Sequence, residues 1–277
     1  DGVSINLKNL NNPRNIESCG PVEMSTHISE ATFGRNDNVV LVGKDSIPDA
    51  LCSASIAGYL DAPILLSDKD ELDEKLLSEL GRLHAKNIYV LSGDKLISRK
   101  VKDQLKAKGY NLYDYSGQDR YETSSKIARF MNADKQFILV SGQDFYDTPS
   151  ISPYSYEKKI PILLTKKNSM PGHTYDLVKK DSSILAIGGD QTIASDVYSQ
   201  LSKKKVKVDK IAGKDRFDTS VKIVKGLYPE SASYICISDK YIVKDIVTSV
   251  MSVKYQKPIV LEKKPYSFTE NKDKNMY

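Results

Sequence analysis

The 277-residue sequence contains no tryptophan, three cysteines, and no apolar run near the roughly 18–20 residues that a membrane-spanning helix needs. Without tryptophan, a sugar site built on indole rings is excluded, although the 17 tyrosines could take that part. The cysteines are far apart and form no Cys-x-x-Cys pair, so neither a disulfide framework nor a zinc site is expected, and Cys52 and Cys236 are predicted to be buried thiols. No basic stretch followed by an apolar one opens the chain, which predicts either a cytoplasmic protein or an exported one whose signal peptide has been removed.

The net charge of +5 is too small to indicate a nucleic-acid-binding protein. It is unevenly distributed, however, with −3 in residues 1–116, +4 in residues 117–212 and +4 in residues 213–277. This imbalance favours an anionic partner for the later part of the chain. The alternative is that the lysines lie on solvated helix faces and bind nothing.

The clearest feature of the sequence is a repeat of about 97 residues. One marker is a proline followed by Ile-Leu-Leu or Ile-Val-Leu, and it occurs at Pro63, Pro161 and Pro258. An acidic residue about fourteen positions earlier recurs at Asp49, Asp147 and Asp245. A third marker, Gly-x-Asp-Arg-aromatic-acidic-Thr-Ser, begins at Gly117 and at Gly213. A period this long has the size of a small domain rather than of a solenoid unit.

The repeat predicts an α/β protein of three tandem βαβ-type units, with short parallel sheets flanked by helices. We place an N-terminal segment at 1–21, full units at 22–116 and 117–212, and an incomplete third unit at 213–277. In the second unit, apolar runs predict strands at 136–141, 161–165 and 184–187. Helices are predicted up to about residue 158, at 175–180 and at 195–204, and the alternation of strands with helices implies right-handed crossovers.

The third marker has the pattern of a capped helix start. Asp119 is suited to the N-cap of a helix and Glu122 to the partner three residues later, and Asp215 and Asp218 repeat this arrangement. The arginines that follow the caps, Arg120 and Arg216, could bridge carboxylates across a junction between units or could hold an acidic ligand.

The sequence offers no catalytic, metal or cofactor constellation. The histidines at 27, 84 and 173 lie in unlike contexts, and we expect His27 at the surface. Glycine-containing turns at 43–46, 93–95 and 188–190 could bind an anion, yet none matches a nucleotide-binding motif. A small-molecule or nucleotide-binding α/β enzyme remains the alternative function, and a purely structural assembly scaffold is a third.

Together these markers resemble the cell wall-binding repeat 2 family of Gram-positive bacteria, known from clostridial surface-layer and cell-wall proteins. The resemblance rests on the Asp119-Arg120-Tyr121-Glu122 start, on Pro48-Asp49-Ala50, on the Pro-Ile-Leu-Leu strand and on the Ser-Gly-Asp or Gly-Gly-Asp turn, over residues 22–277. It implies three copies packed with pseudo-threefold symmetry and no catalytic activity. It also implies an extracellular wall or surface-layer location and non-covalent anchoring to an anionic polysaccharide or teichoic-acid-like polymer. Neither nucleic acid nor a membrane span is implied, and other surface-layer proteins are further possible partners.

The resemblance also implies which residues bind the polymer. The family motif and its polar neighbours map onto Ile64, Leu65, Leu66, Ser67, Ile162, Leu163, Leu164, Thr165, Lys166, Lys167, Ile259, Val260 and Leu261. The motif side chains themselves have the pattern of a strand core, so the polar residues at the strand ends are the better ligand contacts. The first copy departs from the family at Pro21, where an arginine is expected. The third lacks the last helix and strand, so either it is truncated or another segment completes the sheet, with residues 1–20 as the nearest candidate.

Overall fold

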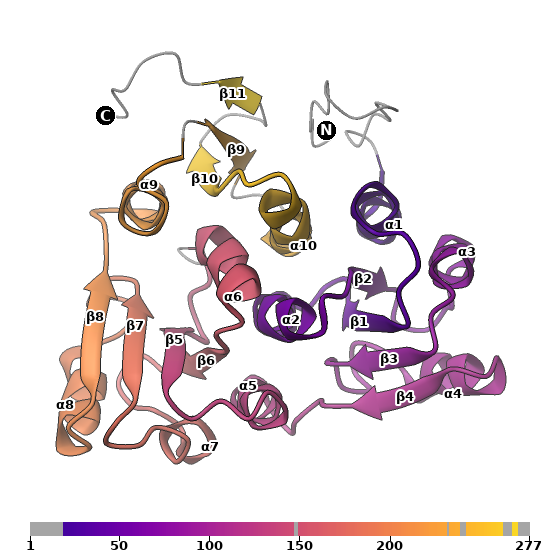
Figure 1. Ribbon diagram of the computed structural model, residues 1–277. Coiled ribbons are helices and arrows are strands. Elements are labelled where there is room, and N and C mark those ends of the chain that lie inside the picture. The colour runs from indigo at the N-terminus through magenta and orange to yellow at the C-terminus, as the bar shows by residue number, and fades with distance from the viewer. Residues whose placement is uncertain (1–18, 147–148, 232, 239–241, 263–267, 271–277) are drawn as a thin grey trace.

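The computed structural model describes residues 19–146, 149–231, 233–238, 242–262 and 268–270. They form three small sheets arranged around a central group of three helices (Figure 1). This is the α/β architecture of short parallel sheets flanked by helices that the repeat predicts.

The first sheet consists of four parallel strands in the order β2-β1-β3-β4. Its elements, in chain order, are α1 Pro21–Thr32, β1 Asn38–Gly43, α2 Ile47–Leu60, β2 Ile64–Ser67, α3 Glu74–Leu83, β3 Asn87–Val90, α4 Arg99–Ala107 and β4 Asn111–Asp114. Helix α2 begins at Ile47, because the Ser46 hydroxyl accepts the N–H of Asp49 and Pro48 occupies the first turn, where its missing N–H costs nothing.

The second sheet repeats the first, with four parallel strands in the order β6-β5-β7-β8. Its elements are α5 Arg120–Phe130, β5 Gln136–Ser141, the 3-10 helix η2 Pro149–Ile151, α6 Ser152–Lys158, β6 Ile162–Thr165, α7 Gly172–Tyr175, β7 Ser183–Ile187, α8 Ser195–Lys203 and β8 Lys207–Ile211. The three strands predicted for this unit are confirmed.

The helix predicted over 175–180 is wrong, because α7 ends at Tyr175. The ammonium of Lys204 donates hydrogen bonds to the carbonyl oxygens of Tyr175 (2.5 Å) and Val178 (2.8 Å), so these acceptors are satisfied without further helical turns.

The third sheet is smaller and mixed. Helix α9 Arg216–Leu227 precedes it in the chain. Its strands are β9 Ser233–Ser238, β10 Ile259–Glu262 and β11 Phe268–Glu270, and helix α10 Ile242–Lys254 connects β9 to β10. Strand β10 pairs parallel to β9, whereas β11 pairs antiparallel to β9 on the edge where β3 and β7 lie in the other sheets. Residues 1–18, most of the segment expected to complete this sheet, lie outside the described residues, and the described strand at this edge is β11.

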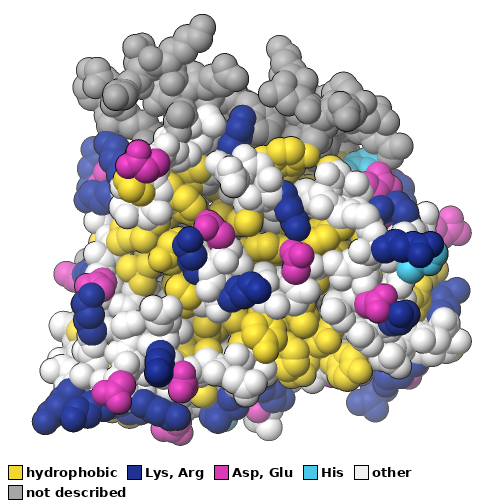
Figure 2. Space-filling view, viewed as in Figure 1, with side chains coloured by type: hydrophobic (Ala, Val, Ile, Leu, Met, Phe, Trp, Pro, Cys, Tyr) yellow, Lys and Arg dark blue, Asp and Glu magenta, His cyan; other side chains and the backbone are white. Residues whose placement is uncertain are grey.

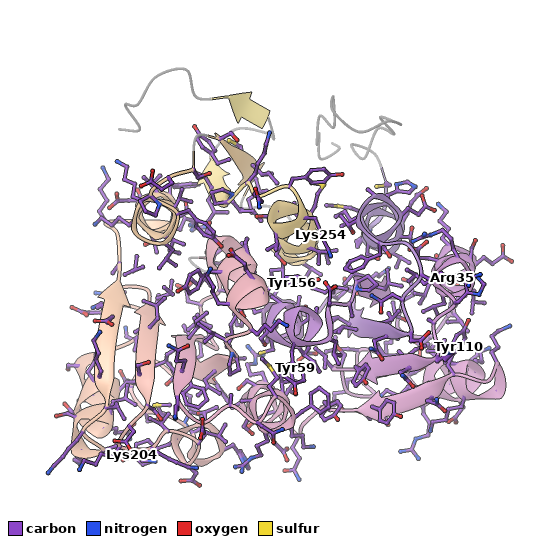
Figure 3. The ribbon with its side chains drawn as sticks, in the orientation of Figure 1. Arg35, Tyr59, Tyr110, Tyr156, Lys204 and Lys254 are labelled. Atoms are coloured by element: carbon purple, nitrogen blue, oxygen red, sulfur yellow. The ribbon has the colours of Figure 1, made fainter. Side chains whose placement is uncertain are left out.

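The predicted pseudo-threefold packing is confirmed by the three helices that follow the central strands. Helices α2, α6 and α10 each pack against the other two (Figure 1). The α2–α6 approach is close, because a Cβ added at Gly58 would lie 2.0 Å from the carbonyl oxygen of Tyr156. Polar contacts join the ends of the same helices: Asp61 lies 3.1 Å from the Lys254 ammonium and 3.5 Å from the Tyr156 hydroxyl (Figure 3).

Candidate functional site

The Ile-Leu-Leu motif is the core of its strand in each unit. The side chains of Ile64, Leu65, Leu66, Ile162, Leu163, Leu164, Ile259, Val260 and Leu261 are all buried. Ser67 and Thr165 at the strand ends are buried as well. Their hydroxyls already have partners, because Ser67 donates to the carbonyl of Asp68 and Thr165 to the carbonyls of Lys166 and Ser169. Of the residues that the motif suggested, only Lys166 and Lys167 are exposed. The surface for a ligand therefore lies beyond the strand ends.

The outer edge of each motif strand is covered by the helix that opens the same unit. The N–H of Leu66 donates to the Ser25 hydroxyl of α1 at 3.0 Å. The equivalent N–H groups in the other units donate to Ser124 of α5 (3.3 Å) and to Ser220 of α9 (3.0 Å). These repeated bonds satisfy an edge donor that would otherwise be buried and unpaired. They also leave that N–H unavailable to a ligand.

The predicted helix caps are present at both α5 and α9. The Asp119 carboxylate accepts the N–H groups of Tyr121 and Glu122, both at 2.9 Å. Glu122 reaches one residue further back than a standard capping box, because its carboxylate accepts the N–H of Gln118 at 2.6 Å. That hydrogen bond is the main cause of the lowered pKa of Glu122. Each cap therefore fixes the direction in which its helix leaves the preceding sheet.

The cap of α9 follows the same plan. The Asp215 carboxylate accepts the N–H of Asp218, whose own carboxylate accepts the N–H of Lys214. The glycines at 117 and 213 are required in these turns, since an added Cβ would lie 2.6 Å and 2.3 Å from the backbone nitrogens of Thr123 and Thr219.

Arg120 lies at the junction between the first and second sheets. Its guanidinium donates a 2.6 Å hydrogen bond to the carbonyl of Gly142, just after β5, and lies 5.4 Å from the ring of Phe145. Its hydrogen bond thus goes to a backbone carbonyl, and in the described part of the chain no carboxylate forms an ion pair with it. Arg216 lies in the same way over Tyr146, at 4.3 Å. Asp147, the acidic repeat marker of this unit, lies outside the described residues.

Asp49 lies beside Arg120 in an open groove of about 580 Å³ at the carboxyl ends of the first-sheet strands. Its Oδ2 accepts the hydroxyl protons of Ser92 (2.6 Å) and Ser46 (2.7 Å). Burial raises the pKa of Asp49 in spite of these bonds and of the positive charge of Arg120. Both partners were missed: Ser92 is 43 residues from Asp49 in the sequence, whereas Ser46, three residues before it, has the spacing of a helix N-cap and could have been found.

The strand ends of the second sheet carry an exposed pair of lysines. The Lys166 ammonium lies 5.9 Å from the ring of Tyr121, and that ring packs directly against Gly142. The backbone N–H of Lys167 donates to Gln143 at 2.9 Å, and its ammonium lies 3.5 Å from the side-chain oxygen of Gln191. Neither lysine forms an ion pair with any carboxylate among the described residues. We refer to Arg120, Lys166 and Lys167 as the cationic edge.

The first sheet has no such edge at the equivalent position. There the residue after the motif strand is Asp68, which forms an ion pair with Lys44. The equivalent of Asp68, 98 residues on, is Lys166, and the equivalent of Lys44 is Gly142. At the Lys166 position the charge is therefore reversed between the two sheets, whereas the equivalent of Lys167 is another exposed lysine, Lys69.

The cysteines and histidines form no site in the described part of the chain. Cys19, Cys52 and Cys236 are buried, as predicted for the last two, no disulfide joins them, and burial raises the pKa of the Cys52 thiol. His27 is half-buried on α1 rather than at the surface. Over these residues no three His, Cys, Asp or Glu side chains are grouped as metal ligands, and no helix has the length and apolar character needed to cross a bilayer.

Comparison with known proteins identifies the repeat. A family model described as Cell wall binding domain 2 (CWB2) matches residues 21–102 and 115–198. The chain belongs to this family. The matched segments run from α1 into α4 and from just before α5 into α8, so each covers three of the four strands of its sheet, and the resemblance inferred from the CWB2 motifs is confirmed.

Two proteins of Bacillus subtilis are similar in sequence to this chain. The chain is 27% identical over 240 residues to the N-acetylmuramoyl-L-alanine amidase LytC of Bacillus subtilis (strain 168), covering 86% of this chain and 47% of LytC. It is 32% identical over 205 residues to the amidase enhancer of the same organism, covering 74% of this chain and 28% of the enhancer.

Two solved structures share the CWB2 fold. Cwp8 from Clostridium difficile matches with a TM-score of 0.81 and 28% identity, over 87% of this chain and 43% of Cwp8. Cwp6 from the same organism matches with a TM-score of 0.80 and 26% identity, over 94% of this chain and 44% of Cwp6. The chain spans less than half the length of each of these four relatives.

Proposed function

We propose that this chain is a non-catalytic anchor that holds an anionic cell-wall polymer at the cationic edge. The observation that carries the proposal is the charge of Lys166 and Lys167, which forms no ion pair among the described residues, while the position of Lys166 is taken in the first sheet by the ion-paired Asp68. Membership of the CWB2 family supports a wall polymer as the partner.

The polymer would be a polysaccharide or teichoic-acid-like chain that carries phosphate or carboxylate groups. The cationic edge offers such groups a guanidinium and two ammoniums, and the side-chain amides of Gln143 and Gln191 flank Lys167. Each exposed charged contact contributes only about 0.2–1 kcal/mol, so useful affinity requires several contacts along one polymer. A repeating anionic polymer meets this requirement.

The relatives also bear on where the chain acts and on whether it carries a catalytic activity. The matches to Bacillus subtilis and Clostridium difficile proteins support the wall or surface layer of a Gram-positive bacterium as the site of action. The amidase activity named for LytC is not transferred, because the match covers less than half of that protein. The predicted units at 22–116, 117–212 and 213–277 would act together, with only the second supplying the cationic edge.

The proposal is tested by sedimentation with isolated cell walls. Wild type should pellet with walls at about 0.1 M NaCl and be released at higher salt, because the Debye length falls from about 10 Å to about 3 Å between 0.1 M and 1 M. The double variant Lys166→Glu with Lys167→Glu should lose most retention at low salt. Its matched control is Lys179→Glu with Lys180→Glu, which changes the same charge on exposed neighbours that precede β7, at the opposite end of the sheet.

Sedimentation with cell walls decides between an anchor and the alternative of a small-molecule or nucleotide-binding α/β enzyme. Equal retention of the two double variants would contradict the cationic edge as the binding site. Absence of wild-type protein from the wall pellet at every salt concentration would contradict wall binding altogether.

A further inference from the structure

Five aromatic side chains form a continuous strip across the junction between the first and second sheets. Tyr89 stacks on Tyr113 with ring centroids 5.1 Å apart, and on Tyr115 at 6.3 Å. Phe130, the last residue of α5, lies 5.6 Å from Tyr89 and 4.9 Å from Tyr115. Tyr59, near the end of α2, meets Phe130 edge-on at 5.7 Å. We call these five residues the aromatic strip.

The aromatic strip is open to solvent at both ends. Tyr113 is 44% exposed and Tyr59 is 40% exposed, so both ring faces are accessible to a ligand. Figure 2 shows hydrophobic side chains gathered over the region between α5 and strands β3 and β4, and Figure 3 places Tyr59 between α2 and α5. Since β4 is the last strand of its sheet, no strand of the described part of the chain pairs with it on the side of Tyr113 away from Tyr89.

The side-chain amides of Asn38, Asn87 and Asn111 form a hydrogen-bonded row on the same face of the sheet, which we call the amide row. The Asn87 amide donates to Asn38 at 3.0 Å, and the Asn111 amide donates to Asn87 at 3.1 Å. Asn87 and Asn111 are paired in register and precede Tyr89 and Tyr113 by two residues, so amides and rings point to one face. An aromatic surface beside amide donors and acceptors is suited to sugar rings, which present C–H groups and hydroxyls together.

The charge of this face favours an uncharged ligand. No member of the aromatic strip or the amide row carries a formal charge, and burial raises the pKa of Tyr89 and Tyr115 further above neutrality. At the end of the amide row, Asp37 and Lys86 neutralise each other in an ion pair of 2.9 Å. The face is therefore electrostatically matched to a neutral glycan and unlike the cationic edge.

The repeat itself does not require these rings. The equivalent positions, 96 residues on from Tyr89, Tyr113, Tyr115 and Phe130, are Leu185, Asp209 and Ile211 in the second sheet and Gly226 in α9. The equivalent of Tyr59, 98 residues on, is Glu157. The second sheet folds with the same strand order without a single ring at these places, so packing alone does not account for the aromatic strip.

We infer that the aromatic strip and the amide row form a second binding site, which takes an uncharged stretch of pyranose rings in a wall glycan. A sugar ring stacked on the open side of Tyr113 extends the Tyr89–Tyr113 stack, and the amide row provides hydrogen bonds to its hydroxyls. The inference rests on the proposed wall binding for the source of the glycan, but it uses different residues and a different physical force.

The test uses wall polysaccharide freed of phosphate by hydrofluoric acid, with binding followed by saturation-transfer NMR and tyrosine fluorescence. The double variant Tyr59→Ala with Tyr113→Ala should bind this neutral probe about tenfold more weakly than wild type, since two stacking contacts are lost. The variant Tyr59→Phe with Tyr113→Phe keeps both rings and should bind within about twofold of wild type. Tyr255→Ala is the matched control, because Tyr255 is 37% exposed and belongs to no ring pair of the strip.

The two sites are separated by comparing variants. The Lys166→Glu with Lys167→Glu protein should bind the neutral probe like wild type while losing salt-sensitive wall retention. Unaltered binding of the neutral probe by the double alanine variant, or no binding of that probe by wild type, would overturn the inference. Binding through the aromatic strip together with undiminished wall retention by the lysine variant would instead overturn the cationic edge alone.

Discussion

The Oδ2 of Asp49 accepts the hydroxyl proton of Ser92 at 2.6 Å, across 43 residues of sequence. Ser92 lies just after β3 and also accepts the N–H of Gly43 at the end of β1, so a single hydroxyl connects two strand ends to the start of α2. The repeat marker that appeared in the sequence as an isolated acidic residue is thus a buried junction between a helix and a sheet.

Asp49→Asn should change how stability depends on pH. Since burial raises the pKa of Asp49, the folded protein holds this proton more tightly than the unfolded chain does. The stability due to this group is therefore present at low pH and lost as the pH rises through the raised pKa. The stability of Asp49→Asn relative to wild type should accordingly increase between about pH 3 and pH 7, measured by urea unfolding at each pH. A difference that falls or stays constant over this range would contradict the prediction.

Ser92→Ala should destabilise the protein at every pH, because it removes a donor from a buried carboxyl group. We expect a loss of about 1–3 kcal/mol in the free energy of unfolding. Urea denaturation followed by circular dichroism gives the value. The control is Ser199→Ala on α8, where the hydroxyl bonds only to the carbonyl of Ser195 on an exposed surface and the change should be within about 0.5 kcal/mol.

Gly58→Ala should separate the central helices. An added methyl group at this position would lie 2.0 Å from the backbone oxygen of Tyr156, which cannot move without shifting α6. The expected cost is about 1–3 kcal/mol. Gly81→Ala in α3 is the matched control, because nothing lies within 4 Å of its added methyl group and the helix should gain about 0.5–1 kcal/mol. Thermal unfolding should move the two melting temperatures in opposite directions.

Arg82→Ala should lower the free energy of unfolding, because it leaves a buried carboxylate without its partner. Glu79 is only 2% exposed, and both its oxygens accept hydrogen bonds of 2.7 Å from Arg82. Removing the arginine leaves this carboxylate buried and unpaired, at a cost of about 3 kcal/mol. The double variant Glu79→Leu with Arg82→Leu should recover much of that loss, because an apolar pair needs no charge partner. Equal destabilisation of the single and double variants would mean that packing, not charge, is lost.

Much of the architecture could be predicted from the sequence because it is local. The strands around Ile138, Ile162 and Leu185 follow from short apolar runs, and the starts of α5 and α9 follow from cap residues a few positions apart. The helix predicted at 175–180 failed because its end depends on Lys204, which is close to Tyr175 only in the folded chain.

The functional surfaces were harder to predict. The Ile-Leu-Leu motif marks the strand that each unit repeats, but the side chains of the motif are buried, so the exposed charge lies beyond it at Lys166 and Lys167. The aromatic strip had no signal in the sequence beyond a high tyrosine count, since its members come from α2, β3, the end of β4 and α5.

The sequence by itself determined the repeat, the type of each unit and the helix caps, because these depend on side chains that are near each other along the chain. Only the tertiary structure decided how the third sheet is completed by β11, how α2, α6 and α10 close the threefold arrangement, and which side chains reach the surface. The physical reason is that each of these depends on which distant segments exclude water from one another, and a period of 97 residues carries no information about that.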